Sequence, residues 1–84
     1  MSTVSLQDAL KHLISGIVDR PEAVEIDSVE SVRGETLEVR VHPDDLGRVI
    51  GRSGRTVQAL RTVIGALARD RRVRIDIVDT DETA

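Results

Sequence analysis

The sequence predicts an α+β fold with the element order α-β-β-α-α-β, in which a three-stranded sheet packs on helices. Three observations lead to this prediction. Two long stretches and one short stretch carry apolar residues with helical spacing, at 4–19, 55–69 and 42–50. Three other stretches alternate apolar and polar residues as half-buried strands do, at 23–32, 36–42 and 72–78. The 84 residues contain no repeat or long linker, so one domain is expected over 1–84, ordered from about residue 3 to 78.

The first helix is expected in residues 4–19. Its apolar stripe follows a 3.6-residue period and consists of Leu6, Leu10, Leu13, Ile14, Ile17 and Val18. Ser2, Thr3 or Ser5 could cap its start, and Ser5 with Asp8 resembles a capping box that has aspartate in place of glutamate. Pro21 restricts Arg20 to extended conformations, so the helix is expected to end at about residue 19 or 20.

The two stretches that follow predict a β-hairpin. The second of them alternates cleanly, with Leu37, Val39 and Val41 expected to face inward and Glu38, Arg40 and His42 outward. The first begins with the same alternation but slips at Val29 and Val32, which predicts either a bulge or an early strand end. Arg33-Gly34-Glu35 supplies the turn between them.

A short helix is expected to begin at His42-Pro43-Asp44-Asp45. Asp44 is a good N-cap, and both carboxylates lie at the positive end of the helix dipole. Paired carboxylates also occur in acid–base catalysis, but helix capping explains them without a catalytic role. Three apolar residues are expected to form the buried face of this helix: Leu46, Val49 and Ile50.

The longest helix is expected in residues 55–69, followed by the last strand. The core stripe of the helix consists of Val57, Leu60, Val63, Ile64 and Leu67. Gly65 costs the helix about 1 kcal/mol relative to alanine, so close packing of another element against it is expected. The strand places Val73, Ile75 and Ile77 on one face, and the polar residues 79–84 predict a frayed tail.

The composition excludes several classes of protein. The chain has no Phe, Tyr or Trp, so its core must be aliphatic and it cannot form the aromatic stacking platform of an RRM. It has no cysteine, and therefore no disulfide or thiolate site. No apolar run is long enough to span a membrane, and the N-terminus lacks the features of a signal peptide. A cytoplasmic protein is expected.

The charge is distributed unevenly along the chain. The formal net charge is −3, which by itself argues against nucleic-acid binding. Residues 48–74, however, contain eight arginines and one acidic residue, whereas residues 1–47 contain ten acidic and four basic residues. Because exposed charges are largely screened beyond about 8–10 Å, the basic segment can attract phosphates on an acidic chain. A solvated helix face is the alternative interpretation of the same charges.

The stretch Val49-Ile50-Gly51-Arg52-Ser53-Gly54-Arg55-Thr56 joins the last two helices through a tight, glycine-bracketed loop. Glycine permits a sharp turn and a close backbone approach. Amides exposed at the start of the second helix favour a negatively charged oxygen, to which the neighbouring arginines add formal charge. The stretch therefore predicts a phosphate clamp without catalytic groups.

The same residues resemble a known family. Val49-Ile50-Gly51-Arg52-Ser53-Gly54 is similar to the Val-Ile-Gly-x-x-Gly signature of the KH domain, and the element order resembles the type II, bacterial variant of that fold. The stretches His-Pro-Asp-Asp-Leu-Gly-Arg-Val-Ile-Gly (42–51) and Gly-Arg-Thr-Val-Gln-Ala-Leu-Arg-Thr (54–62) are similar to the small KhpA family of bacterial RNA-binding proteins. The resemblance covers nearly the whole chain and implies a single type II KH domain.

This resemblance implies a protein that binds single-stranded RNA. In KH domains the loop clamps the backbone of about four nucleotides, and the bases lie in a groove beside the helices. Carried over by position, the backbone contacts fall to Gly51, Arg52, Ser53 and Gly54, with Arg48 and Arg55 as added phosphate contacts. Val49, Ile50 and Val57 are candidates for the groove, and their pattern fits the hydrophobic core equally well.

The resemblance also implies partners. KhpA-like proteins associate with themselves and with a larger KH-containing protein, KhpB, also called Jag or EloR. They are regarded as RNA chaperones or post-transcriptional regulators, linked in some bacteria to cell elongation and envelope synthesis. The expected partners are therefore single-stranded RNA and a second copy or a KhpB-type protein, without a membrane.

Two other functions were weighed against RNA binding. The domain could be an interaction scaffold that dimerises or docks a larger KH partner and contacts RNA only incidentally. It could instead be a nucleotide-hydrolysing enzyme, but a P-loop would need glycine where Val49 stands. His12 and His42 are the only histidines, and His12 fits a helix flank, so no metal site, cofactor or catalytic residue is expected.

Overall fold

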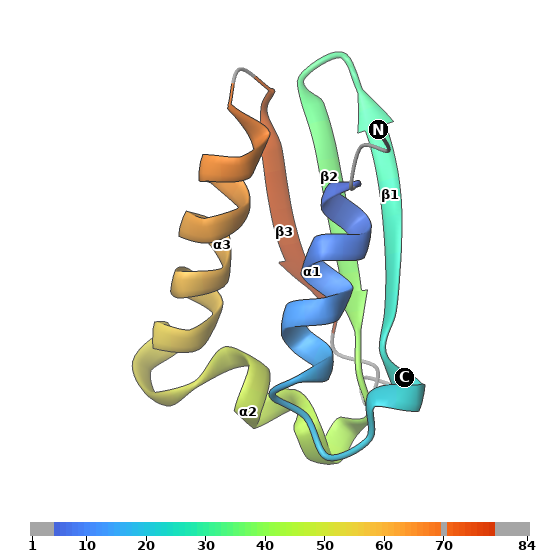
Figure 1. Ribbon diagram of the computed structural model, residues 1–84, viewed down its shortest axis with the longest axis vertical. Coiled ribbons are helices and arrows are strands. Elements are labelled where there is room, and N and C mark those ends of the chain that lie inside the picture. The colour runs from blue at the N-terminus through green and yellow to red at the C-terminus, as the bar shows by residue number, and fades with distance from the viewer. Residues whose placement is uncertain (1–4, 70, 79–84) are drawn as a thin grey trace.

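Two helices lie on one face of a three-stranded mixed sheet in the computed structural model (Figure 1). The structure describes residues 5–69 and 71–78. The helices are α1 (Leu6–Ser15), α2 (Leu46–Ile50) and α3 (Arg55–Ala68), and the strands are β1 (Glu25–Ser31), β2 (Gly34–Arg40) and β3 (Val73–Ile77). Short 3₁₀ turns occupy Pro21–Ala23, Pro43–Asp45 and Arg52–Gly54. The predicted α+β fold and its element order are confirmed.

The sheet has the strand order β1-β2-β3, with β1 antiparallel and β3 parallel to β2. The pairing of β1 with β2 is continuous from Glu25 opposite Arg40 to Ser31 opposite Gly34, so the expected bulge or early strand end is wrong. The alternation of apolar and polar residues in this stretch is interrupted for a different reason. Val29 lies on the open face of the sheet, 47 % exposed, and Val32 is fully exposed in the turn before Gly34.

The core between sheet and helices is aliphatic throughout. Leu37, Val39 and Val41 face inward, as predicted. The apolar residues that are at most 1 % exposed come from all three helices and the central strand: Leu10, Ile14, Leu37, Val39, Val49 and Ile64. On the opposite face of the sheet, Arg40 forms ion pairs with Asp27 and Glu38. The charged outer face that the sequence predicts is therefore confirmed.

Helix α1 begins as predicted but ends earlier. The Ser5 hydroxyl accepts a hydrogen bond from the Asp8 backbone N–H at 3.0 Å, which caps the first turn. The helix ends at Ser15, because Gly16 follows and glycine is a poor helix former. The chain then continues as a turn, in which the N–H of Val18 still donates to the Ile14 carbonyl oxygen at 3.2 Å.

The expected N-cap role of Asp44 is wrong. The residue before the Pro43–Asp45 turn is His42, and its Nδ1 accepts a hydrogen bond from the Asp44 backbone N–H at 3.1 Å. The Asp44 carboxylate points outward and pairs with the Arg20 guanidinium at 2.9 Å. Because Pro43 fits the first position of a helical turn, the turn starts there and its N-cap lies two residues before the expected Asp44.

Helix α3 presents a different face to the core than the sequence pattern predicts. The buried residues are Val57, Leu60, Ile64 and Ala68. Val63 and Leu67, predicted for the core, are 44 % and 54 % exposed. A Cβ added at Gly65 would meet nothing within 4 Å, so the expected packing against this glycine is absent from the described structure. The predicted polar tail, 79–84, lies outside the described residues.

Candidate nucleic-acid interface

The loop between α2 and α3 depends on Gly51. Its backbone angles, φ 79° and ψ 170°, lie in a region that is essentially restricted to glycine. A Cβ at this position would lie 2.3 Å from Oγ1 and 2.7 Å from the backbone nitrogen of Thr56. Gly51 therefore allows the loop backbone to lie directly against the first turn of α3.

The turn that follows Gly51 has a backbone geometry that suits an anion. Ser53 (φ 56°, ψ 27°) and Gly54 (φ 75°, ψ 16°) are both left-handed, and the Gly54 N–H donates to the Gly51 carbonyl oxygen at 3.1 Å. A right-handed residue followed by a left-handed one, as at Arg52-Ser53, turns successive N–H groups toward one concavity that suits an anion. The N–H of Arg55, the first residue of α3, already donates to the Arg52 carbonyl oxygen. Because no described side chain caps α3, the N–H groups that follow Arg55 in the first turn remain available to a ligand or water.

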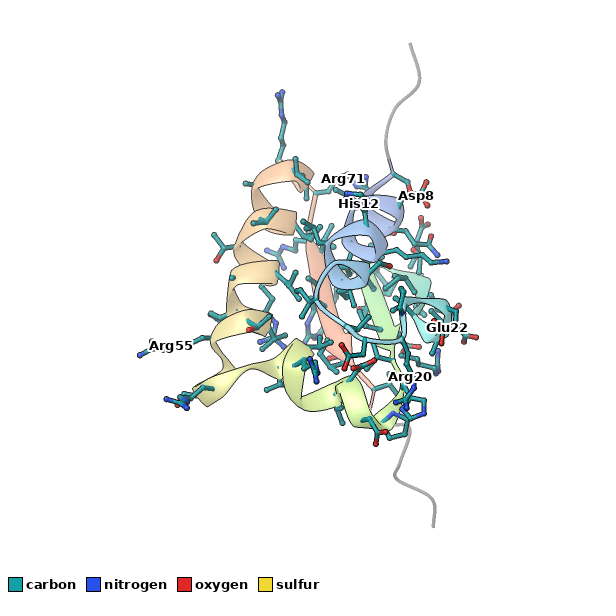
Figure 2. All side chains as sticks on the ribbon, turned by 60° about the horizontal axis from the view of Figure 1, so that its bottom comes forward. Asp8, His12, Arg20, Glu22, Arg55 and Arg71 are labelled. Atoms are coloured by element: carbon teal, nitrogen blue, oxygen red, sulfur yellow. The ribbon has the colours of Figure 1, made fainter. Side chains whose placement is uncertain are left out.

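Two arginine side chains lie near the start of α3. Arg52 and Arg55 are exposed, and neither forms an ion pair or side-chain hydrogen bond with another described residue. Figure 2 shows Arg55 extending outward from the start of α3. The loop therefore combines a helix N-terminus, a tight turn and two guanidinium groups that no described residue pairs with.

Arg48, the third predicted cation, is already engaged. Its Nη2 lies 3.0 Å from Asp19 Oδ2, and its Nε lies 3.6 Å from Asp45 Oδ1. A phosphate would have to compete with these carboxylates for the guanidinium. Unlike Arg52 and Arg55, Arg48 is therefore already paired with acidic residues, a difference that the sequence alone does not show.

Asp45 fixes α2 to the segment after α1. Its carboxylate is 1 % exposed, and its two oxygens accept the backbone N–H groups of Asp19 and Arg20 at 3.1 and 3.0 Å. Burial raises the pKa of this carboxyl group, but the two N–H donors and the charges of Arg48 and Arg20 outweigh it and hold the pKa below its usual value. Asp45 is therefore a charged, buried support of the helix that leads into the loop.

The three predicted groove residues lie in different environments. Val49 is fully buried in the core, and Val57 is 7 % exposed. Ile50, which was also predicted for the buried face of α2, is 37 % exposed next to the loop. Of the three side chains, only that of Ile50 is presented to a ligand to any large extent.

The described residues offer no alternative metal or membrane site. Among them, no three His, Cys, Asp or Glu residues are grouped so that they could hold a metal ion. No helix in 5–69 is both apolar and long enough to cross a membrane.

Comparison with known proteins identifies the family. The family model described as KhpA/KhpB, KH domain matches residues 7–78. The chain belongs to this KH-domain family. A relative from Streptomyces coelicolor named RNA-binding protein KhpA is 60 % identical over 76 residues, which are 90 % of this chain and 95 % of the relative. Proteins of the same name from Leifsonia xyli subsp. xyli and Mycobacterium tuberculosis are 62 % identical over 74 residues and 56 % over 75.

The family assignment confirms the resemblance seen in the loop and its flanks. The Leifsonia match covers 88 % of this chain and 97 % of the relative, and the Mycobacterium match covers 89 % and 92 %. The names of these relatives describe RNA-binding proteins and no enzymatic activity, in agreement with the non-enzymatic protein predicted. No solved structure matches this chain significantly.

The structure adds one cation of this KH domain that the sequence interpretation did not include. Arg61 of α3 donates from Nη2 to the Ile75 carbonyl oxygen of β3 at 3.2 Å, and from Nη1 to Gln58 Oε1 at 3.4 Å. Because backbone groups of Arg72 and Val78 bond to β2, those of Ile75 point to the free edge of β3. Arg61 therefore bridges α3 and this edge.

A cleft of about 250 Å³ lies at this bridge. It is lined by Arg61 of α3 and by consecutive residues of β3: Val73, Arg74, Ile75 and Asp76. The sequence contains no local signal for it, because six residues along a helix place Arg61 about 120° around α3 from Arg55. The contact itself depends on the parallel placement of β3 beside β2, which periodicity does not indicate.

Proposed function

We propose that this protein binds single-stranded RNA and grips its backbone with the loop Gly51-Arg52-Ser53-Gly54. The observation that carries the proposal is the combination of a left-handed turn and a helix N-terminus without a side-chain cap with two unpaired guanidinium groups at the start of α3. Phosphate oxygens bind such helix N-termini readily, and arginine adds charge-assisted hydrogen bonds. The name RNA-binding protein KhpA, carried by relatives up to 62 % identical, supports the same ligand.

The proposal assigns unequal roles to the predicted site residues. Arg52 and Arg55 are the main phosphate contacts because no described residue neutralises them. Arg48 is a weaker contact because Asp19 and Asp45 hold it. Ile50 supplies exposed apolar surface for a base, whereas Val49 and Val57 support the groove from the core.

The site favours weak binding with little sequence preference. KH loops clamp about four nucleotides of backbone, and backbone contacts carry little sequence information. The chain has no aromatic residue, so it lacks the stacking that is worth about 1–3 kcal/mol per base in other single-strand binders. Weak binding with little sequence preference suits an RNA chaperone or post-transcriptional regulator in the cytoplasm. A link to cell shape, which the resemblance to the KhpA family implies, belongs to this same proposal.

A charge-matched pair of variants tests RNA binding. The loop variant Arg52→Gln/Arg55→Gln removes two positive charges and retains both glycines. Lys11→Glu changes the net charge by the same amount on the exposed side of α1, away from the loop. We expect the loop variant to bind a labelled single-stranded tetranucleotide at least tenfold more weakly in fluorescence anisotropy, and Lys11→Glu to bind it like the native chain. Equal losses in both variants would refute the assignment to the loop.

The exposed face of α3 favours a second function, self-association. Ala59, Val63, Ala66 and Leu67 are all exposed and follow the i, i+4, i+7, i+8 spacing of one helix face. We propose that this stripe pairs with a second copy of the chain or with the KH domain of a KhpB-type protein. A second copy would also raise the effective RNA affinity, because two weak modules then act on one strand.

Sedimentation equilibrium tests this pairing. We expect the native chain to dimerise and Leu67→Glu to be monomeric, because the charge would be buried in the interface. Gln58→Glu introduces the same charge on the polar face of α3, where Gln58 contacts Arg61, and should leave the dimer intact. A native chain that stays monomeric at high micromolar concentration would refute the second function without affecting the first.

A further inference from the structure

Strand β1 forms the edge of the sheet that lies farthest from α3 (Figure 1). Its seven residues, Glu-Ile-Asp-Ser-Val-Glu-Ser, pair with β2 without a bulge. Edge strands are usually kept from pairing with another chain by being very short or by carrying a bulge, a proline or a lysine. Strand β1 has none of these four features, so its edge is open to a further strand.

The pairing register shows which backbone groups of β1 face the open edge. The Glu35 N–H and the Val39 carbonyl oxygen of β2 both bond to residues that flank β3, at 2.9 Å each. Odd-numbered residues of β2 therefore bond to the β3 side, and even-numbered residues bond to β1. In the register, these even-numbered residues lie opposite odd-numbered residues of β1. The backbone groups left for the open edge belong to the even-numbered residues of β1, which are Ile26, Ser28 and Glu30.

Helix α1 covers only the start of this edge. The side-chain amide of Gln7 donates a hydrogen bond to the Ile26 carbonyl oxygen. Within the described part of the chain, no residue bonds to the edge-facing N–H and C=O groups of Ser28 and Glu30. Such groups bond to water in the free protein, and an extended peptide can replace the water with ladder hydrogen bonds. The two residues thus offer two donors and two acceptors to an added strand.

The charge of β1 determines which kind of strand fits beside it. The strand contains three acidic residues and no basic one. Glu25 and, in the turn before β1, Glu22 are exposed, and neither forms an ion pair with another described residue. Figure 2 shows Glu22 on the side of the molecule opposite Arg55. Two β1 strands side by side would gather six carboxylates, three from each, so a second copy is a poor partner and a basic strand is a good one.

We propose that β1 is a docking site for an extended basic segment of another protein, which adds a fourth strand to the sheet. Because Ile26 is buried toward the helices, its neighbours Glu25 and Asp27 face the open side of the sheet. Lysines or arginines at alternate positions of the segment would lie beside these carboxylates, and apolar residues between them would lie beside Ile26. The site is separate from the RNA-binding loop, so this inference does not depend on the proposed function.

A set of labelled peptides tests strand addition. The probe is a fluorescein-labelled, end-capped heptapeptide in which lysine and valine alternate. One control peptide has glutamate in place of each lysine, and the other has the same lysines and valines in two blocks. We expect anisotropy titrations to show that the native chain binds both control peptides at least tenfold more weakly than the probe. If the block peptide binds as tightly as the probe, alternation is irrelevant and strand addition is refuted.

Two charge-matched variants test whether the probe binds at β1. Glu25→Gln removes a carboxylate from β1, and Asp8→Asn removes one from the exposed side of α1. We expect Glu25→Gln to bind the probe about threefold more weakly than the native chain, the effect of one exposed ion pair, and Asp8→Asn to bind it like the native chain. Equal losses in the two variants would show a general attraction to an acidic protein and would refute the site at β1.

Amide hydrogen exchange, followed by NMR on the native chain, measures the backbone contacts directly. We expect saturating probe to slow the exchange of the Ser28 and Glu30 amides at least tenfold. The amide of Ile75, which faces the opposite edge of the sheet, is the control and should exchange at an unchanged rate. Unchanged exchange at Ser28 and Glu30 would overturn the proposal even if the titrations agreed with it.

Discussion

Replacing single glycines by alanine should have effects of opposite sign on stability, and Gly51→Ala should be the most damaging change in the loop. At φ 79° and ψ 170°, the strained backbone alone costs an alanine about 1–3 kcal/mol. The new Cβ would also lie 2.3 Å from Thr56 Oγ1 and 2.7 Å from its backbone nitrogen. Relieving such overpacking costs about 1–3 kcal/mol more.

The total of about 2–6 kcal/mol is a large part of the stability of so small a domain, because native domains have about 0.05–0.15 kcal/mol per residue. Gly54 has the second positive φ of the motif, but a Cβ there would touch only Val57 Cγ1, at 4.0 Å. Gly54→Ala should therefore cost about 1–2 kcal/mol, the penalty of a left-handed alanine. A substitution by alanine should therefore cost more stability at Gly51 than at Gly54, although the sequence motif does not distinguish these two glycines.

Gly47 and Gly65 serve as internal controls. Both lie in helices, and a Cβ at either would meet nothing within 4 Å. Alanine should stabilise each position by up to about 1 kcal/mol. Urea unfolding followed by far-UV circular dichroism measures the series, since the chain has no tryptophan or tyrosine to report by fluorescence. If Gly51→Ala is no more destabilising than Gly54→Ala, the argument from the Thr56 contact is wrong.

Three further predictions concern single residues. Asp45→Asn should be less stable than the native chain at pH 7, because the two N–H groups donate to different carboxylate oxygens and the amide replaces one of these acceptors with an NH2 donor. The pKa of Asp45 is lowered in the folded protein, so the extra stability of the native chain over Asp45→Asn should persist down to about pH 4 and decrease at lower pH. Urea unfolding midpoints of the two proteins at pH 7 and pH 3 would show this. Arg69→Gly should stabilise the domain by about 1 kcal/mol, because Arg69 has φ 57° and ψ −107°; an unchanged urea midpoint would contradict this. Arg61→Ala should reduce the dependence of log RNA affinity on log salt concentration by about 0.7, the effect of one lost phosphate contact, and should change the free energy of unfolding by less than about 0.5 kcal/mol. An unchanged salt dependence would show that Arg61 does not contact a phosphate.

Local sequence signals predicted the element order and the loop well. Gly51 and Gly54 mark positions that only special backbone angles satisfy, and the cleanly alternating β2 segment placed Leu37 and Val39 in the core. These features depend on residues close together in the chain. For the same reason the Ser5 cap of α1 was predictable from the residues around it.

The misplaced features depend on contacts between distant segments. Val63 and Leu67 fit a helical stripe, but α1 and the sheet cover only one side of α3, and Ala68 completes the buried face instead. The role of Asp45 depends on the turn after α1, twenty-five positions away. Arg61 meets Ile75 only because β3 runs parallel to β2 at the edge of the sheet. Periodicity carries no information about such neighbours.

The support that Asp45 gives to α2 has a consequence for the order of folding events. The short helix, the loop and α3 are contiguous in sequence, so they can form early as a local unit. The hydrogen bonds of Asp45 to Asp19 and Arg20 close intervals of 26 and 25 residues, and such non-local contacts carry a loop-closure cost. We expect these bonds to form after the main barrier, so that Asp45→Asn accelerates unfolding and leaves the refolding rate nearly unchanged. An RNA-gripping loop of fixed orientation would then be a property of the completed domain, acquired only when the N-terminal helix has docked.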